Sequence, residues 1–280
     1  MTSKLNHRNF IYISAGLSML VILSFIIAPL IPPGIDWSTV FRPAAKEVLH
    51  FRSPFNVDGF FNPPWAAMAL IPFAMLPEQV GRVFLIFTGL IAYAYIAYKL
   101  GGSKWAIIAI VLSPPVMHNM LNGNIDWLAL LGLVMPPQLG LFFITMKPQI
   151  GAAVAAFWLV ESWRMGGYRQ TIKVFWPITV ATIISFLFYG LWPLRARVEV
   201  NLWWNASLWP VSLPVGLVLL VTSLRKRDVS YAMGASPCFS PYILFHSWVI
   251  AVYAIVRSTP ETITAVIGLW ALVIIRYLGG

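Results

Sequence analysis

Charge is scarce in this sequence. Of its 280 residues, 10% are charged and only nine are acidic, whereas 59% are hydrophobic. A water-soluble domain is roughly a quarter charged, so this composition excludes an ordinary soluble fold. The apolar runs are long and do not alternate, which favours helices that satisfy their own backbone hydrogen bonds in lipid. The composition therefore predicts an all-α polytopic membrane protein.

Residue types that carry chemistry are also few. The single cysteine, Cys238, excludes an intramolecular disulfide framework and a cysteine-based zinc site. Four scattered histidines predict no metal centre, with a divalent ion kept as an alternative. P-loop, Rossmann, HExxH and GxSxG patterns are missing. The net charge of +10 comes from basic clusters at the ends of apolar runs, where they set orientation, so we expect no nucleic-acid partner.

The apolar runs predict one membrane domain over residues 1–280, with about eight to ten spans. We expect a core at 10–161 and C-terminal helices at 174–280. The runs cover 10–31, 83–98, 105–117, 125–146, 148–161, 174–192, 208–223, 237–256 and 262–278.

Basic residues predict the orientation of the chain. Lys4 and Arg8 precede a first run that is too long for a signal peptide and has no small-residue cleavage site after it. We expect a retained first helix with a cytoplasmic N-terminus, in the plasma membrane. Basic linkers at 164–173 and 225–227 then fall on the cytoplasmic side. Loops at 32–64 and 193–207 face outward.

Segment 63–77 leaves two topologies open. If it spans the membrane, the lysines at 99 and 104 face out. If it lies at the interface, these lysines face the cytoplasm, and Asp126 joins the outer loop at 32–64. The run 125–146 must then break at Pro136-Pro137, as proline pairs do, and we favour this second topology.

The outer loop at 32–64 holds three of the nine acidic residues, Asp36, Glu47 and Asp58. Asp36 lies just beyond the first run, where a carboxylate can accept a proton from an incoming hydroxyl. It is therefore a candidate catalytic residue, and a helix N-cap is the alternative.

The same loop carries a basic stripe. Arg42, Lys46 and His50 are spaced four apart, so on a helix they share one face, and Arg52 follows. Such a stripe suits the phosphate of a lipid-linked substrate. Snorkelling toward anionic headgroups is the alternative, as is pairing with the acidic residues of the loop.

Aromatic residues mark both outer loops. Asn62 and Trp65 flank Pro63-Pro64, and this rigid edge suits stacking on a sugar or anchoring at the interface. Tryptophans and arginines of the second loop suit a sugar phosphate, with an interfacial belt as the alternative. These residues are Arg195, Arg197, Trp203 and Trp204.

Polar residues at membrane depth are costly and usually functional. Asp126 beside an apolar run is therefore a second candidate catalytic residue, with Asn122 and Asn124 as hydrogen-bonding companions; a tight Asn-Gly turn is the alternative. Lys147, between two apolar runs, could hold a phosphate, neutralise Asp126 or snorkel to the surface. His246, in a late run, indicates a hydrogen-bonded interior residue rather than a ligand.

The order of these segments resembles the GT-C class of polytopic glycosyltransferases, and within it members that use polyprenyl-phosphate mannose or related donors. An early Asp is followed by A-A-K-E-V-L-H-F-R-S-P-F, F-F-N-P-P-W, S-P-P…N-G-N-I-D and T-M-K-P-Q. The resemblance implies an inverting hexosyl or pentosyl transfer on the outer face, often without a metal. Asp36 takes the position of the base, and basic residues of the outer loops lie near the carrier phosphate.

The chain departs from this pattern at several positions. Phe51-Arg52 replaces an expected glycine, and Asn62 replaces an aromatic residue. Two other hypotheses therefore stay open. One is a non-catalytic GT-C-like subunit with membrane-protein partners; the other is a lipid or solute transporter, although inverted repeats are not apparent. The sugar and the acceptor, whether lipid, glycan or protein, do not follow from the sequence.

Overall fold

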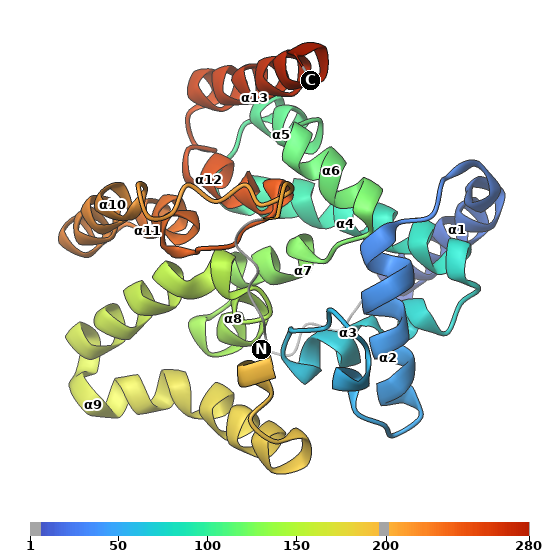
Figure 1. The fold of residues 1–280 in the computed structure, drawn as a ribbon, viewed down its shortest axis with the longest axis horizontal. Coiled ribbons are helices and arrows are strands. Elements are labelled where there is room, and N and C mark those ends of the chain that lie inside the picture. Colours follow the sequence, from blue (N-terminus) through green and yellow to red (C-terminus); the bar gives the residue numbers. More distant parts are fainter. Residues whose placement is uncertain (1–6, 196–201, 280) are drawn as a thin grey trace.

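The computed structural model describes residues 7–195 and 202–279, and every regular element within these ranges is helical (Figure 1). Within the same ranges, one isolated β-bridge joins Asn205 to Leu244. The all-α class expected from composition is therefore confirmed.

The described ranges contain thirteen α-helices, most of which follow one another closely, with longer connections before α2, α3, α10 and α12. Their bounds are α1 (His7–Ile27), α2 (Arg42–Leu49), α3 (Pro64–Ala74), α4 (Glu78–Lys99), α5 (Lys104–Val111), α6 (Pro114–Asn122), α7 (Asp126–Leu131), α8 (Pro137–Ile144), α9 (Pro148–Tyr189), α10 (Leu213–Lys226), α11 (Val229–Ala235), α12 (Val249–Ala254) and α13 (Thr259–Gly279).

Three of these helices are long and apolar enough to cross a membrane: α4, α9 and α13. The pair α5 and α6, bent by 46°, adds a fourth if it is one broken span. These helices indicate a membrane protein, but in the described ranges they are fewer than the about eight to ten spans expected from the apolar runs. Prolines explain much of the difference, because Pro114 and Pro137 each begin a new helix inside an apolar run.

Helix α9 is bent where the sequence predicts a basic linker between two runs. Gly166 and Gly167 have non-helical backbone angles, and Gly167 has a φ of +58°, which glycine adopts without strain. The bend gives α9 the V shape seen in Figure 1. The runs at 148–161 and 174–192 are thus the two arms of one bent element.

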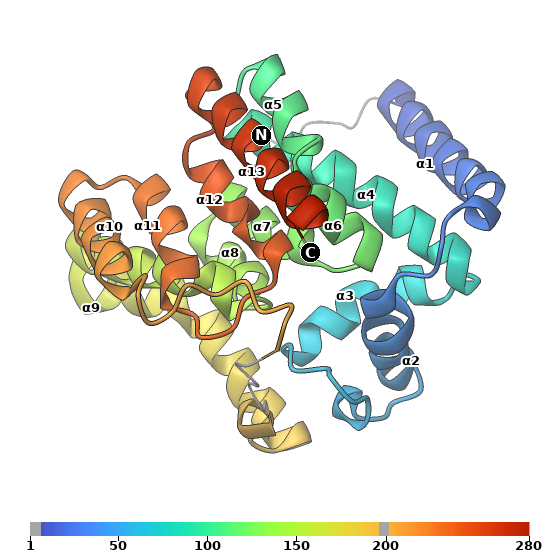
Figure 2. The same ribbon diagram turned by 45° about the horizontal axis from the view of Figure 1, so that its top comes forward.

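Helix α3 is too short to cross a bilayer. Its 11 residues extend about 17 Å at 1.5 Å per residue, against a hydrocarbon core of about 30 Å. It packs against α2 beside the start of α4 (Figure 2). The run at 125–146 breaks before Pro137, as the favoured topology requires.

The buried core connects the N-terminal loop to later helices. Trp37 and Phe41 belong to the same hydrophobic cluster as Trp127, Ile150 and Tyr253. This packing brings the segments around residues 36, 124, 147 and 246 to one place, where the polar residues described next are found.

Candidate functional site

A buried tryptophan fixes the position of Asp36. Trp37 is fully buried, and its Nε1 donates to the carbonyl of Glu78 at 3.0 Å. Asp36 itself is half-buried, and its Oδ2 accepts from Asn124 Nδ2 at 2.7 Å. Its side chain caps no backbone N–H of the turn that follows, so capping does not account for it among the described residues.

Asn124 is held in a single orientation by the turn that precedes it. Gly123 ends α6 with a φ of +71°, and a Cβ there would lie 2.5 Å from Cβ of Trp37. The Asn124 Oδ1 accepts from the backbone N of Ile125 at 2.7 Å, which leaves Nδ2 directed at Asp36. The tight Asn-Gly turn and the functional interpretation are therefore compatible, since the turn positions the amide.

Asp126 lies deeper, with no exposure to solvent. Its Oδ1 is 3.3 Å from Nζ of Lys147, and its Oδ2 accepts from Oγ of Ser247 at 2.7 Å. The same Oδ2 is 2.6 Å from Nδ1 of His246. A buried carboxylate needs such partners. Of the three alternatives for Lys147, neutralisation of Asp126 is the one found, and His246 is the hydrogen-bonded interior residue expected.

Two residues of the Pro-Pro-Trp edge connect the first loop to the turn between α8 and α9. Asn62 Nδ2 donates to the carbonyl of Met146 at 2.5 Å, next to Lys147. Trp65 Nε1 donates to the carbonyl of Phe142 at 2.8 Å, and the two rings meet edge to face. Both residues thus hold the loop against the segment that carries Lys147.

The basic stripe forms on a helix, as predicted, but most of its side chains already bind groups of the protein itself. Arg42 lies 3.4 Å from the carboxylate of Glu78. Nδ1 of His50 lies 2.7 Å from the carbonyl of Lys46. The ammonium of Lys46 has no ion pair with any described residue, so it is the cation of the stripe that is free to meet a ligand.

Arg52 is neutralised within the loop. It pairs with Glu47 at 2.6 Å, and Asn56 also donates to that carboxylate, at 3.2 Å. The hydrogen bonds from Arg52 and Asn56 hold the pKa of Glu47 below its ordinary value. Pairing within the loop, named above as an alternative, is what the structure shows for Arg52.

A pocket of about 360 Å³ is formed by residues of the first loop together with Arg195, at the start of the segment 193–207. Arg195 lines it together with Asp58 and Phe55, and the guanidinium lies 5.9 Å from the centroid of the Phe55 ring. Arg195 thus lies beside the first loop, and its role in binding a phosphate stays a prediction. Arg197 lies outside the described residues.

The two tryptophans of this loop differ in their surroundings. Trp203 is exposed, whereas Trp204 Nε1 donates to the hydroxyl of Tyr242 at 3.2 Å. Burial raises the pKa of Tyr242, the bond from Trp204 opposes this, and the negative charge of Asp36 raises it further. Tyr242 is therefore protonated at neutral pH and within electrostatic range of Asp36.

Sequence reasoning missed several polar residues of this region. His118 has its ring 5.5 Å from that of His246, and its Nε2 is 3.4 Å from Nδ2 of Asn122. Ser247 and Tyr242 were also not predicted. The signal that could have found Ser247 was its place beside His246, where two polar residues interrupt a late apolar run.

The described residues form no group of three metal-ligating side chains. Comparisons with protein-family models, with curated proteins and with solved structures gave no match. The chemistry of the site therefore rests on its own geometry. It offers an accessible carboxylate, Asp36, held by one amide, above a buried ion pair, Asp126–Lys147.

Proposed function

We propose that this protein is an integral-membrane glycosyltransferase that moves a sugar from a polyprenyl-phosphate donor to an acceptor hydroxyl. The observation that supports it best is the half-buried carboxylate of Asp36, oriented by Asn124 at 2.7 Å and set beside a membrane-embedded core. A carboxylate so placed has a free oxygen with which to accept a proton.

In this mechanism Asp36 takes the proton of the acceptor hydroxyl while that oxygen attacks the anomeric carbon. The bond from the anomeric carbon to the phosphate breaks on the opposite face, and the configuration inverts. The phosphate leaves with its electron pair, and nearby cations offset its charge. We assign this task to Lys46 and Arg195, because neither forms an ion pair with a described residue.

Asp126 acts as a positioning residue in this proposal. It is fully buried and already accepts from Ser247, with Lys147 and His246 at its other edges, so it does not reach substrate. It holds the start of α7, two residues after Asn124. This role replaces the direct catalytic role expected from the sequence.

The test is donor consumption by purified protein in native-lipid membranes. A panel of polyprenyl-phosphate sugars is followed by mass spectrometry, comparing wild type with Asp36→Asn. The substitution keeps an oxygen for Asn124 to donate to, so the fold is retained while the base is lost. We expect a decrease of about 10²- to 10⁴-fold.

Glu47→Gln is the matched control, because Glu47 lies in the same loop but its carboxylate accepts only from Arg52 and Asn56 among the described residues. It should keep full activity. Full transfer by folded Asp36→Asn would refute the proposal.

A proton-coupled transporter is the second candidate function. The observation that favours it is the buried set of Asp126, Lys147 and His246, because ionisable groups inside a membrane protein often mark a transport path. Donor-independent proton uptake in sealed vesicles, abolished in Asp126→Asn but not in Asp36→Asn, would select this function over sugar transfer.

A further inference from the structure

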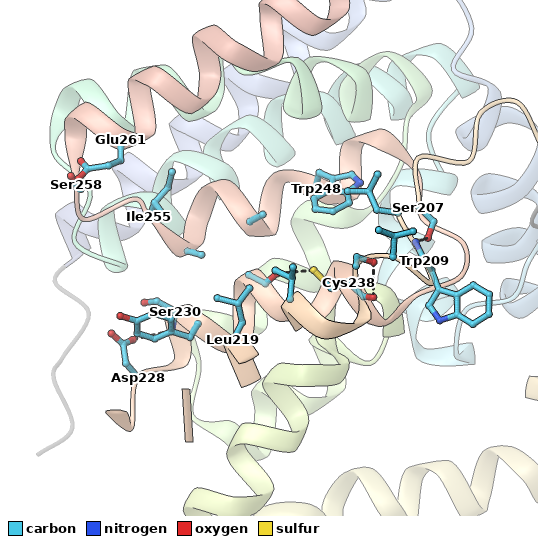
Figure 3. Close-up of a pocket in the computed structure, with 18 of the residues that line it drawn as sticks. Ser207, Trp209, Leu219, Asp228, Ser230, Cys238, Trp248, Ile255, Ser258 and Glu261 are labelled. Carbon is cyan, nitrogen blue, oxygen red and sulfur yellow. Dashed lines mark hydrogen bonds between the residues drawn. The ribbon is translucent and has the colours of Figure 1, made fainter. Parts of the chain in front are cut away.

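A large groove lies at the C-terminal end of the chain, separate from the site described above. Its volume is about 1090 Å³, just above the roughly 300–1,000 Å³ of small-molecule sites. Helices α10 and α11 form one wall, and α12 and the start of α13 form the other. Figure 3 shows Leu219 and Cys238 midway along it.

The middle of the groove is apolar. Val215, Leu219 and Ile255 line it, and small residues such as Gly234 and Ala254 leave its floor open. Helix α10 alone extends about 21 Å along one wall, from its 14 residues. The walls can therefore accept an acyl chain along most of its length.

The two ends of the groove differ in charge. Asp228 and Glu261 lie on opposite walls at one end, whereas Trp209, Trp248 and Ser207 line the other (Figure 3). The charged end follows directly on the basic residues 225–227. A headgroup belongs at the charged end, and the tail in the apolar part.

Arg257 completes the charged end. Its Nε donates to the carbonyl of Leu100 at 3.2 Å, and its Nη1 is 4.0 Å from Asp228, beyond hydrogen-bond distance. The Nη atoms can therefore donate to a phosphate. Glu261 is exposed and pairs with no described cation, so a carboxylate is left to meet an ammonium group.

We propose that this groove binds a glycerophospholipid with an ethanolamine headgroup. The phosphate contacts Arg257, the ammonium lies between Asp228 and Glu261, and one acyl chain follows Leu219 toward Trp209. Lys226, whose Nζ donates to the hydroxyl of groove-lining Tyr231 at 2.9 Å, adds a second cation for the phosphate. Phosphatidylglycerol offers no ammonium to the two carboxylates, and this selects against it. The proposal does not depend on the proposed glycosyltransferase activity. The headgroup contacts lie at the charged end of the groove, away from Ser207 and Trp248.

The experiment is native mass spectrometry of the purified full-length protein in mixed micelles. The micelles contain phosphatidylethanolamine, phosphatidylglycerol and phosphatidylcholine with the same acyl chains. We expect retained phosphatidylethanolamine to exceed phosphatidylglycerol. Glu261→Gln should lower this preference by about two- to fivefold, the range of a single exposed charge pair. Glu78→Gln, also an acid in the first turn of a long helix, is the matched control and should leave it unchanged.

Leu219→Trp fills the middle of the groove and should remove the bound lipid. Leu217→Trp, on the exposed side of the same helix, should not. Equal retention of the ethanolamine and glycerol lipids would overturn the proposal, as would undiminished lipid in folded Leu219→Trp. So would a copurifying apolar helix whose removal exposes the groove, because the occupant would then be protein.

Discussion

Nδ2 of Asn124 donates to Oδ2 of Asp36 at 2.7 Å and so joins two residues that lie 88 positions apart in the chain. The burial of Trp37 fixes the position of Asp36, and the left-handed turn at Gly123 fixes the position of Asn124. The bond therefore makes the first loop and the start of α7 one unit.

This bond predicts the effect of Asn124→Asp. The new side chain keeps the shape and the acceptor for Ile125, but it puts a second carboxylate beside Asp36. Like charges disfavour ionisation of both, so the rise of kcat/KM with pH should move to higher pH by about one unit or more. The measurement is the rate–pH profile of sugar transfer.

The control for this experiment is Asn122→Asp, two residues earlier, where the amide faces His118 instead. It should leave the profile close to that of wild type. A drop in rate with an unmoved profile in Asn124→Asp would mean that Asn124 only supports the fold.

The buried ion pair predicts a specific pattern of stability. Lys147→Met leaves the carboxylate of Asp126 without its cation, and breaking a buried pair costs about 3–5 kcal/mol. Adding Asp126→Asn removes the uncompensated charge, so the double variant should recover much of this loss. Thermal unfolding in detergent measures the stability of the single and the double variant. Lys173→Met, on an exposed part of α9, is the control and should change the stability little. A double variant as unstable as the sum of the two single variants would show that they do not interact.

Sequence patterns predicted the fold class and several local features. Apolar runs indicated helices, the basic linker at 164–173 marked the bend of α9, and the proline pair at 136 and 137 marked the break before α8. Each of these depends on local chemistry: hydropathy, glycine flexibility or the missing N–H of proline. The described residues hold fewer helices of full spanning length than predicted, because an apolar run shows that a segment lies in an apolar medium but not that it crosses that medium.

The candidate site was predicted in part. Asp36 was predicted as a carboxylate just beyond the first apolar run, Asp126 and its companion Asn124 as costly polar residues at membrane depth, and Lys147 as a cation between two runs. The structure brings these four residues together. That Arg42 pairs with Glu78 was not predictable, since the spacing of a helix shows which residues share a face but not what packs against it. The contact of Ser247 with Asp126 spans 121 positions and has no local signal.

Glu47 predicts a pH dependence of the first loop. Hydrogen bonds from Arg52 and Asn56 lower its pKa below the ordinary 4.5. The stabilisation they give is therefore fully present above pH 4.5 and is lost as the pH falls through the lowered native value. Hydrogen exchange of residues 47–57, normalised to the unfolded peptide, should accelerate over that range. In Glu47→Gln the exchange of the loop should not accelerate over this pH range. If the acceleration persists in this variant, another group is responsible for the titration.

Gly123 gives the most direct test of how the site is built. Its φ of +71° is unfavourable for any residue with a Cβ, and that Cβ would lie 2.5 Å from Cβ of Trp37. Gly123→Ala should therefore destabilise the protein by about 1–3 kcal/mol and displace Asn124 from Asp36. Gly268→Ala is the matched control, because Gly268 lies within α13 with no atom near its would-be Cβ. There the same change should stabilise, by about 0.5–1 kcal/mol. Thermal unfolding of the two variants thus gives shifts of opposite sign. Equal shifts would mean that the turn at Gly123 does not hold Asn124 against Asp36.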